Sequence, residues 1–175
     1  MNHLRQILKD NLLSSFEDIK INIAEENRII IECRKESIIT VLSHLKSDGF
    51  NHLSLISCVD WINENTFELV YILTAYTEDP EKGGLNLLVK TKVVRDKPTL
   101  YTVINVFSNA EPFERELHEL YGIHFSGHPR LTPLLLERSY EIPPFRKDFD
   151  TRQYVEDFFK QIPTIEEKKR TNERT

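Results

Sequence analysis

The sequence predicts an α+β fold: a single domain with a mixed, largely antiparallel sheet, helices packed on one face of that sheet, and an extended C-terminal segment. Segments with helical and strand-like periodicity follow one another in the order α-β-β-α-β-β-β. The 175 residues, of which 39% are hydrophobic and 29% are charged, are enough for one domain with its own core. We expect residues 1–149 to form this domain and residues 150–175 to form a helix and a charged, flexible tail.

The first half of the domain opens with an amphipathic helix, predicted over residues 3–16 by apolar side chains at helical spacing. Alternating isoleucines in residues 19–23, a polar turn and a second isoleucine run in residues 29–31 predict a β-hairpin. The apolar positions within residues 38–45 share one helix face, and Gly49 is typical of the end of such a helix.

Three β-rich runs follow this second helix. They are HLSLISCVDW (52–61), TFELVYILTAY (66–76) and GLNLLVKTKVV (84–94), with a turn between the last two. The next run, LYTVINVF (100–107), stays open between strand and helical turn. Its β-branched residues favour a strand, whereas its place before a helix start would suit a turn.

A helix is predicted over the residues between Asn109 and Gly122, with Pro112 in its first turn. Ser108 or Asn109 can cap its start, and Gly122 is typical of its end. The apolar residues of this helix form one stripe, so we expect the charged residues of ERELHE (114–119) to lie off the core-facing side. The acidic residues Glu114 and Glu116 would then complement the positive end of the helix dipole.

The segment after this helix combines irregularity with unusual apolarity. Residues 127–149 contain several prolines, which indicates a loop, yet LTPLLLE and PPF are apolar for a loop that faces water. Beyond it, apolar residues from Tyr154 to Ile162 share one helical face before Pro163, and the charged EEKKRTNERT sequence predicts disorder.

Composition excludes several classes of function. The net charge of -5 argues against a nucleic-acid partner, which would require a clustered basic face. No apolar run approaches the roughly 20 residues that span a bilayer, and the start of the chain is too polar for a signal peptide, so we expect a cytosolic protein. Cys33 and Cys58 lie in apolar strands and are interpreted as buried thiols; two cysteines cannot supply the four thiolates that an iron–sulfur cluster usually takes.

The histidine-rich stretch ERELHELYGIHFSGHPRL (114–131) raises the question of a catalytic or metal site. His118, His124 and His128 lie close together in sequence, but Gly122 stands where an H-E-x-x-H zinc helix would have its second histidine. Neither a nucleophile motif nor a glycine-rich phosphate loop is present. Arg115 and Glu119, four residues apart, could form a plain surface pair or face a partner.

Two motifs in this region carry a family resemblance. E-R-E-x-x-E-L-Y-G-I-x-F-x-G-H-P (114–129) is followed by PPFRKDF (143–149), and CVDW and FELVYIL lie upstream. Together they resemble the C-subunit family of NADH–quinone oxidoreductase (respiratory complex I) and the equivalent small subunits of membrane-bound nickel–iron hydrogenases and sulfur-reducing complexes.

The resemblance implies a scaffold subunit that has no cofactor and performs no catalysis, in a complex that couples electron transfer to ion translocation. Such a subunit would dock on a large hydrogenase-like, D-subunit-like protein and on iron–sulfur subunits, on the cytoplasmic side of the membrane, with membrane subunits reached indirectly. Iron–sulfur clusters and, in the hydrogenase type, a nickel–iron centre would belong to the partners. The expected partner-interface residues comprise motif positions and the apolar face of the C-terminal helix: Glu114, Arg115, Glu116, Gly122, Gly127, His128, Pro129, Arg146, Lys147, Asp148, Tyr154, Phe158 and Phe159.

Three departures from the complex I pattern affect the choice of branch. Arg130 stands where complex I members usually have an acid, Thr132–Pro133 replaces a basic pair, and Asp150 replaces a frequent proline. They favour a hydrogenase-type or sulfur-reducing complex, with the C subunit of NADH–quinone oxidoreductase as the alternative. A free-standing metal-dependent enzyme that uses Glu114, His118 and His128 is the remote alternative.

Overall fold

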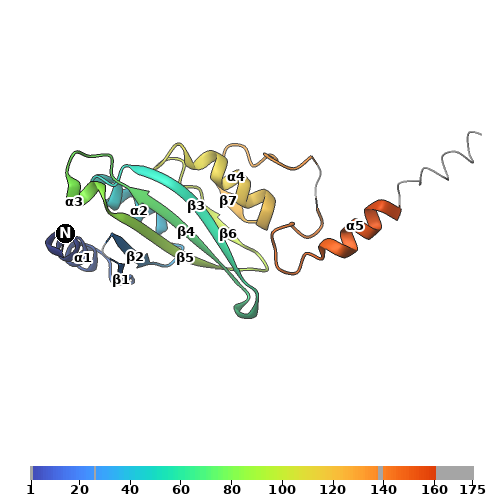
Figure 1. The fold of residues 1–175 in the computed structure, drawn as a ribbon, viewed down its shortest axis with the longest axis horizontal. Coiled ribbons are helices and arrows are strands. Elements are labelled where there is room, and N and C mark those ends of the chain that lie inside the picture. Colours follow the sequence, from blue (N-terminus) through green and yellow to red (C-terminus); the bar gives the residue numbers. More distant parts are fainter. Residues whose placement is uncertain (1, 26, 138–139, 161–175) are drawn as a thin grey trace, which may run out of the picture.

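The computed structural model describes residues 2–25, 27–137 and 140–160. In this part of the chain the helices are α1 (Asn2–Ser15), α2 (Ile38–Ser47), α3 (Pro80–Gly83), α4 (Ala110–Tyr121) and α5 (Thr151–Lys160), with a 3₁₀ turn η1 (Ile62–Glu64). The strands are β1 (Lys20–Glu25), β2 (Arg28–Glu32), β3 (His52–Trp61), β4 (Thr66–Thr74), β5 (Asn86–Val94), β6 (Thr99–Tyr101) and β7 (His124–Ser126). The predicted α+β class is confirmed, and each predicted element of the first 94 residues is present (Figure 1).

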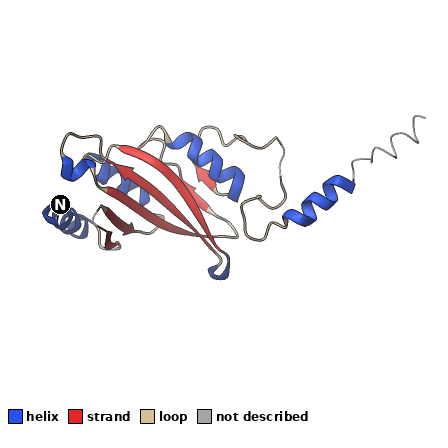
Figure 2. Ribbon diagram, in the orientation of Figure 1, coloured by secondary structure: helices blue, strands red, loops and turns tan. Residues whose placement is uncertain are grey.

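The main sheet has the strand order β1-β2-β5-β4-β3. The β1–β2, β3–β4 and β4–β5 pairs are antiparallel, whereas β2 and β5 are parallel, so the sheet is mixed and largely antiparallel as predicted. The long strands β3 to β5 curve together, and η1 closes the β3–β4 hairpin at a corner that projects from the rest of the sheet (Figure 2).

One face of this sheet packs against the helices. Leu69 and Tyr71 of β4 and Val89 of β5 are fully buried in a core that also contains side chains of α1, α2 and α4. The opposite face is different, because Val59 and Trp61 of β3 are 37% and 40% exposed. The alternation of side chains along each strand therefore separates a covered face from a partly bare one.

Residues 100–107, for which the sequence left strand and helical turn open, contain the end of a strand followed by a turn. Thr99–Tyr101 forms β6, and the chain then turns through residues 104–106 before α4 begins. β6 pairs in parallel with β7, which lies directly after α4 and was not predicted. The two strands form a second, small sheet that packs beside α4 and contributes Leu100 and Phe125 to the core.

The C-terminal helix α5 extends away from the body of the molecule, beyond the end of the main sheet (Figure 1). It lies within the segment 150–175, for which a C-terminal helix was predicted. Ile162, Pro163 and the charged tail, which complete the predicted segment 150–175, lie outside the described residues.

Candidate functional site: the α4 helix and the segment it anchors

Helix α4 is held against the edge of the main sheet. Asn109 lies at its N-cap position, but its side chain does not cap the helix; its amide Nδ2 instead donates to the carbonyl of Leu53 in β3 at 2.7 Å. At the other end, Tyr121 donates its hydroxyl to the carbonyl of Cys58 at 3.3 Å, and Gly122 ends the helix with φ of 75° as predicted. Bonds near both ends of α4 thus join it to β3.

The carboxyl group of Glu114 is completely buried, with 0% of the residue exposed. It accepts a hydrogen bond of 2.5 Å from the hydroxyl of Thr102 and one of 2.7 Å from the amide of Val103. Burial raises the pKa of Glu114 to about 7, although both hydrogen bonds act in the opposite direction. The expectation that the charged residues of α4 lie off the core-facing side is therefore wrong for Glu114. The reason is the segment directly after β6, whose Thr102 hydroxyl and Val103 amide meet the carboxylate on that side of the helix.

Arg115 is also buried, and it binds the loop that follows β7. Its Nε donates to the carbonyl of Thr132 at 3.0 Å, and its Nη2 donates to the carbonyl of Pro133 at 2.9 Å. The carboxylate paired with it is Glu111, at 3.4 Å, rather than Glu119. Arg115 therefore connects one turn of α4 to two carbonyls of the loop.

Glu119, one turn further along α4, binds the amides of the same loop. Its carboxylate accepts hydrogen bonds from the backbone N–H groups of Leu134, Leu135 and Leu136 at 3.1, 2.9 and 2.6 Å. Burial would raise the pKa of Glu119, but these amides hold it below its usual value. The loop of residues 132–136 is therefore held at two of its carbonyls by the guanidinium of Arg115 and at three of its amides by the carboxylate of Glu119.

The second motif, PPFRKDF, folds back onto α4. Phe145 donates its amide to the carbonyl of Leu120 at 3.0 Å, and Arg146 donates its Nε to the carbonyl of Tyr121 at 2.7 Å. These two carbonyls belong to the last turn of the helix, where carbonyl groups have no N–H donor within the helix. Gly122 is required here because a Cβ would lie 3.0 Å from Arg146 Nη2 and because its φ is positive.

A charge cluster joins the same motif to the main sheet. Arg95, just after β5, donates to both carboxylate oxygens of Asp60 in β3, at 2.9 and 3.1 Å, and to both oxygens of Asp148, at 3.1 and 2.5 Å. The amide of Lys147 donates to Asp60 at 2.9 Å. Although burial alone would raise the pKa of Asp60, these donors hold it below its usual value. Arg95 is thus shared by two carboxylates from distant parts of the chain.

The histidines do not form a common centre in the described structure. His118 Nδ1 lies 2.8 Å from the carbonyl of Ile123, and His128 Nε2 lies 3.4 Å from the carbonyl of Glu111, while His124 is exposed. Among the described residues, no group of three or more His, Cys, Asp or Glu side chains could hold a metal ion.

The other predicted interface residues lie in varied surroundings. Glu116 is half-buried on α4, and Gly127 follows β7 with a φ of 85°. Pro129 and Lys147 are exposed.

The apolar face of α5 begins a chain of aromatic contacts. The ring of Tyr154 lies 5.1 Å from that of Tyr140, 5.6 Å from that of Phe149 and 6.4 Å from that of Phe158, measured between centroids. Asp150 accepts hydrogen bonds from the amides of residues 152 and 153, so it caps α5. The side chain of Phe159 lies outside the described part of the structure.

The sequence did not point to Asp60, Arg95 and Thr102, and it did not identify Glu119 as the acceptor for the amides of a loop. One signal was available, since CVDW places a carboxylate near the end of a strand in which the two preceding alternate residues, Ile56 and Cys58, are apolar. A carboxylate in such a position needs a partner, and Arg95 follows another strand of the same sheet. Thr102 carries no comparable signal.

The two cysteines are buried and free, as predicted. Burial raises the pKa of Cys33 and of Cys58 to about 12, so both thiols stay protonated at neutral pH. In the described part of the chain, no helix is long and apolar enough to cross a membrane.

Comparison with known proteins assigns the chain to a family. The family model described as "Respiratory-chain NADH dehydrogenase, 30 Kd subunit" matches residues 31–155. The chain is 35% identical over 130 residues to the NADH-quinone oxidoreductase C subunit of Neorickettsia sennetsu, a match that covers 74% of this chain and 67% of that protein. It is 36% identical over 118 residues to the F(420)H(2) dehydrogenase C subunit of Methanosarcina mazei, a match that covers 66% of this chain and 72% of that protein. Against an NADH-quinone oxidoreductase C subunit of Rhizobium rhizogenes, the match spans 60% of the relative's length.

Two solved structures share the fold. A chain of the membrane-bound sulfane sulfur reductase, described as an archaeal respiratory membrane complex, matches with a TM-score of 0.78 and 28% identity over 92% of this chain and 94% of that chain. A trypsin-resistant fragment of Nqo5 matches with a TM-score of 0.61 and 26% identity over 73% of this chain and 98% of the fragment. With the family model matching more than half of its length, the chain belongs to the family of the 30 kDa, or C, subunit of respiratory-chain NADH dehydrogenase.

Proposed function

We propose that this protein is a non-catalytic scaffold subunit of a membrane-bound, energy-converting redox complex of the hydrogenase-related or sulfur-reducing type. It holds no cofactor of its own. It docks on a large hydrogenase-like subunit and on iron–sulfur subunits at the cytoplasmic side of the membrane, and those partners hold the clusters that transfer electrons.

The observation that carries this proposal is the near full-length correspondence with a chain of the sulfane sulfur reductase complex, over 92% of one chain and 94% of the other. The surface described above supports it. Exposed apolar side chains occur on the segment that α4 anchors, including Leu135 and Phe145 at 63% and 58% exposure. Exposed apolar surface of this kind is typical of a face that another protein covers.

A second candidate is the C subunit of an NADH–quinone oxidoreductase. It is favoured by the 35% identity with the Neorickettsia sennetsu protein. The two candidates share the scaffold role and differ in the companion subunits, since the second requires a flavoprotein module that oxidises NADH.

The test is affinity purification of the tagged chain from its native membranes in mild detergent, followed by mass spectrometry. We expect a hydrogenase-like large subunit and iron–sulfur subunits in stoichiometric amounts. The presence of NADH-oxidising flavoprotein subunits would select the second candidate. Recovery of the chain alone, from the soluble fraction, would refute the scaffold role.

A further inference from the structure

Loop 132–136 is anchored from both sides of its backbone. Arg115 binds the carbonyls of Thr132 and Pro133, and Glu119 binds the amides of Leu134, Leu135 and Leu136. Both anchoring side chains come from successive turns of α4. An irregular segment that only connects two parts of a chain does not need five backbone groups fixed by two charged side chains.

The anchored loop directs leucines outward. Leu134 is 40% exposed and Leu135 is 63% exposed, while Arg115, which binds the two carbonyls directly before them, is only 9% exposed. Fixing this backbone in advance removes the ordering cost that a flexible loop would meet on binding.

The hydrogen-bond state of the loop also suits an apolar environment. An amide that enters an apolar pocket without an acceptor costs free energy, because it loses its bond to water. In loop 132–136 the three amides of the leucines already have Glu119 as acceptor, at 2.6 to 3.1 Å. The backbone at these leucines can therefore move from water into an apolar environment without leaving an amide N–H group unpaired.

We propose that Leu134 and Leu135 insert into an apolar pocket of a neighbouring protein subunit, with Arg115 and Glu119 as the residues that position them. This inference rests on the scaffold function proposed above and specifies one contact of it. The partner's pocket has to be apolar at its floor and need not supply hydrogen-bond acceptors to the leucine amides.

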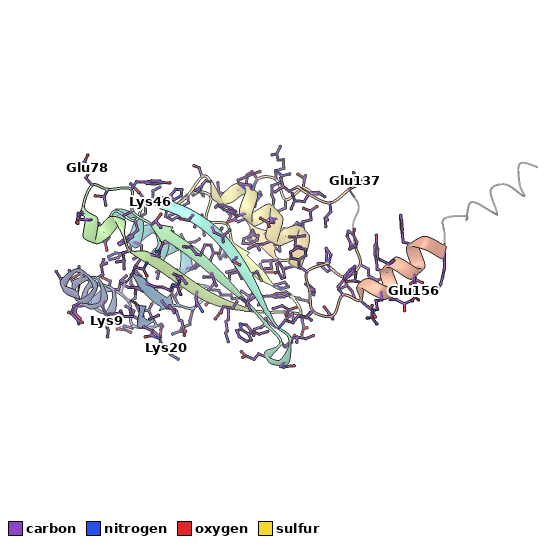
Figure 3. All side chains as sticks on the ribbon, viewed as in Figure 1. Lys9, Lys20, Lys46, Glu78, Glu137 and Glu156 are labelled. Atoms are coloured by element: carbon purple, nitrogen blue, oxygen red, sulfur yellow. The ribbon has the colours of Figure 1, made fainter. Side chains whose placement is uncertain are left out.

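A protein pocket fits this loop better than a lipid surface. Membrane attraction of an exposed apolar loop is strengthened by clustered Lys and Arg beside it. Here the exposed Arg130 before the loop is a single described cation rather than a cluster, the exposed carboxylates Glu137 and Glu141 follow the loop, and the whole chain has a net charge of -5. Glu137 directly follows the loop, at the edge of the molecule (Figure 3). Relatives of this chain are also named as subunits, so companion proteins exist for them.

The test compares matched variants of the full-length tagged chain in its native host. Leu135→Asp should lower the recovery of partner subunits by about tenfold or more, as expected for a central interface residue. Leu13→Asp, on the exposed side of α1 at 45% exposure, is the matched control and should leave recovery unchanged. Glu119→Ala should reduce recovery although both leucines remain, which identifies its role as positioning.

A second measurement covers the case in which a variant fails to fold. A photo-crosslinking residue, p-benzoylphenylalanine, is placed at position 135 and irradiated in the assembled complex. A crosslink to one protein subunit supports the inference, whereas crosslinks to lipid alone, or none, overturn it. If the wild-type chain and the Leu135→Asp variant recover the same amounts of partner subunits, this contact is refuted and the scaffold function remains intact. If the wild-type chain itself recovers no partners, the scaffold function is refuted.

Discussion

Glu114 is a carboxylic acid whose burial in the described structure strongly disfavours its charged form. The carboxyl group has two hydrogen bonds but no exposure to water, and its pKa is raised to about 7 from 4.5. Because the raised pKa belongs to the folded state, protonation of this group favours folding. The group therefore contributes stability that is fully present below pH 4.5 and is lost as the pH rises through 7.

Replacement of Glu114 by Gln removes this dependence. Gln can still accept from Val103 and contact Thr102, but it does not ionise. We expect the wild-type protein to lose about 3 kcal/mol relative to Glu114→Gln between pH 4.5 and pH 8, following the size of the pKa shift. Urea unfolding of both proteins across this range is the measurement. All other titrating groups are shared by the two proteins, so their contributions cancel in the comparison. Plots of unfolding free energy against pH that run parallel for the two proteins would contradict the burial of Glu114.

Arg95 provides a second prediction for a single residue. Its side chain is 10% exposed and that of Asp60 is 2% exposed, so Arg95→Met leaves a buried carboxylate without its partner. We expect this change to lower the free energy of unfolding by about 3–5 kcal/mol. The control is Lys92→Met, which removes the surface pair with Glu64 and should cost less than about 1 kcal/mol. Similar losses in the two variants would show that the Asp60 carboxylate is not held by Arg95.

Single charged residues also mark the limit of prediction from sequence. The positions of Glu114, Arg115 and Glu119 on a helix were predicted from periodicity, and the helix is observed. What each carboxylate or guanidinium contacts was not predictable, because those contacts come from the turn after β6 and from loop 132–136, which periodicity does not describe. The designation of Glu114 and Arg115 as interface residues stays a prediction.

Among the elements, α5 carries the clearest expectation. Truncation after Asp150 removes a helix whose residues are absent from the described hydrophobic core. We expect the free energy of unfolding to change by less than about 1 kcal/mol, as for surface changes, while association with partner subunits weakens. Urea unfolding and the affinity purification described above measure the two effects. A large loss of stability would mean that α5 belongs to this chain's own core.

The elements differ in how well the sequence predicted them. Long segments with strong periodicity, such as β3, β4 and α2, were predicted within a few residues because their apolar spacing extends over several turns or alternations. β7 has three residues, too few for any period to appear, and it exists because it pairs with β6 across α4. The 100–107 segment was ambiguous because it contains the end of a strand and a turn.

At the scale of the whole molecule, the predicted fold class and the order of the first elements are confirmed. The predicted layering is confirmed as well: helices bury one face of the sheet, and the other face keeps Val59 and Trp61 accessible. The strands were predicted from local patterns, but strand order and the parallel β2–β5 pair depend on contacts between residues about 60 positions apart. Such contacts leave no local pattern in the chain.

The ion pairs that Arg95 forms with Asp60 and with Asp148 limit which substitutions homologous sequences can accept at these three positions. Because one buried guanidinium is shared by two carboxylates, the effect of a substitution at one of these positions depends on the other two, and loss of Arg95 leaves the buried Asp60 carboxylate without a charged partner. These three positions should therefore change together among homologues, and lineages that lose Arg95 should replace Asp60 by an uncharged residue. The aspartate of the RKD motif (Arg146–Asp148) would then be retained because of its shared partner Arg95 and, through it, because of Asp60 near the end of β3.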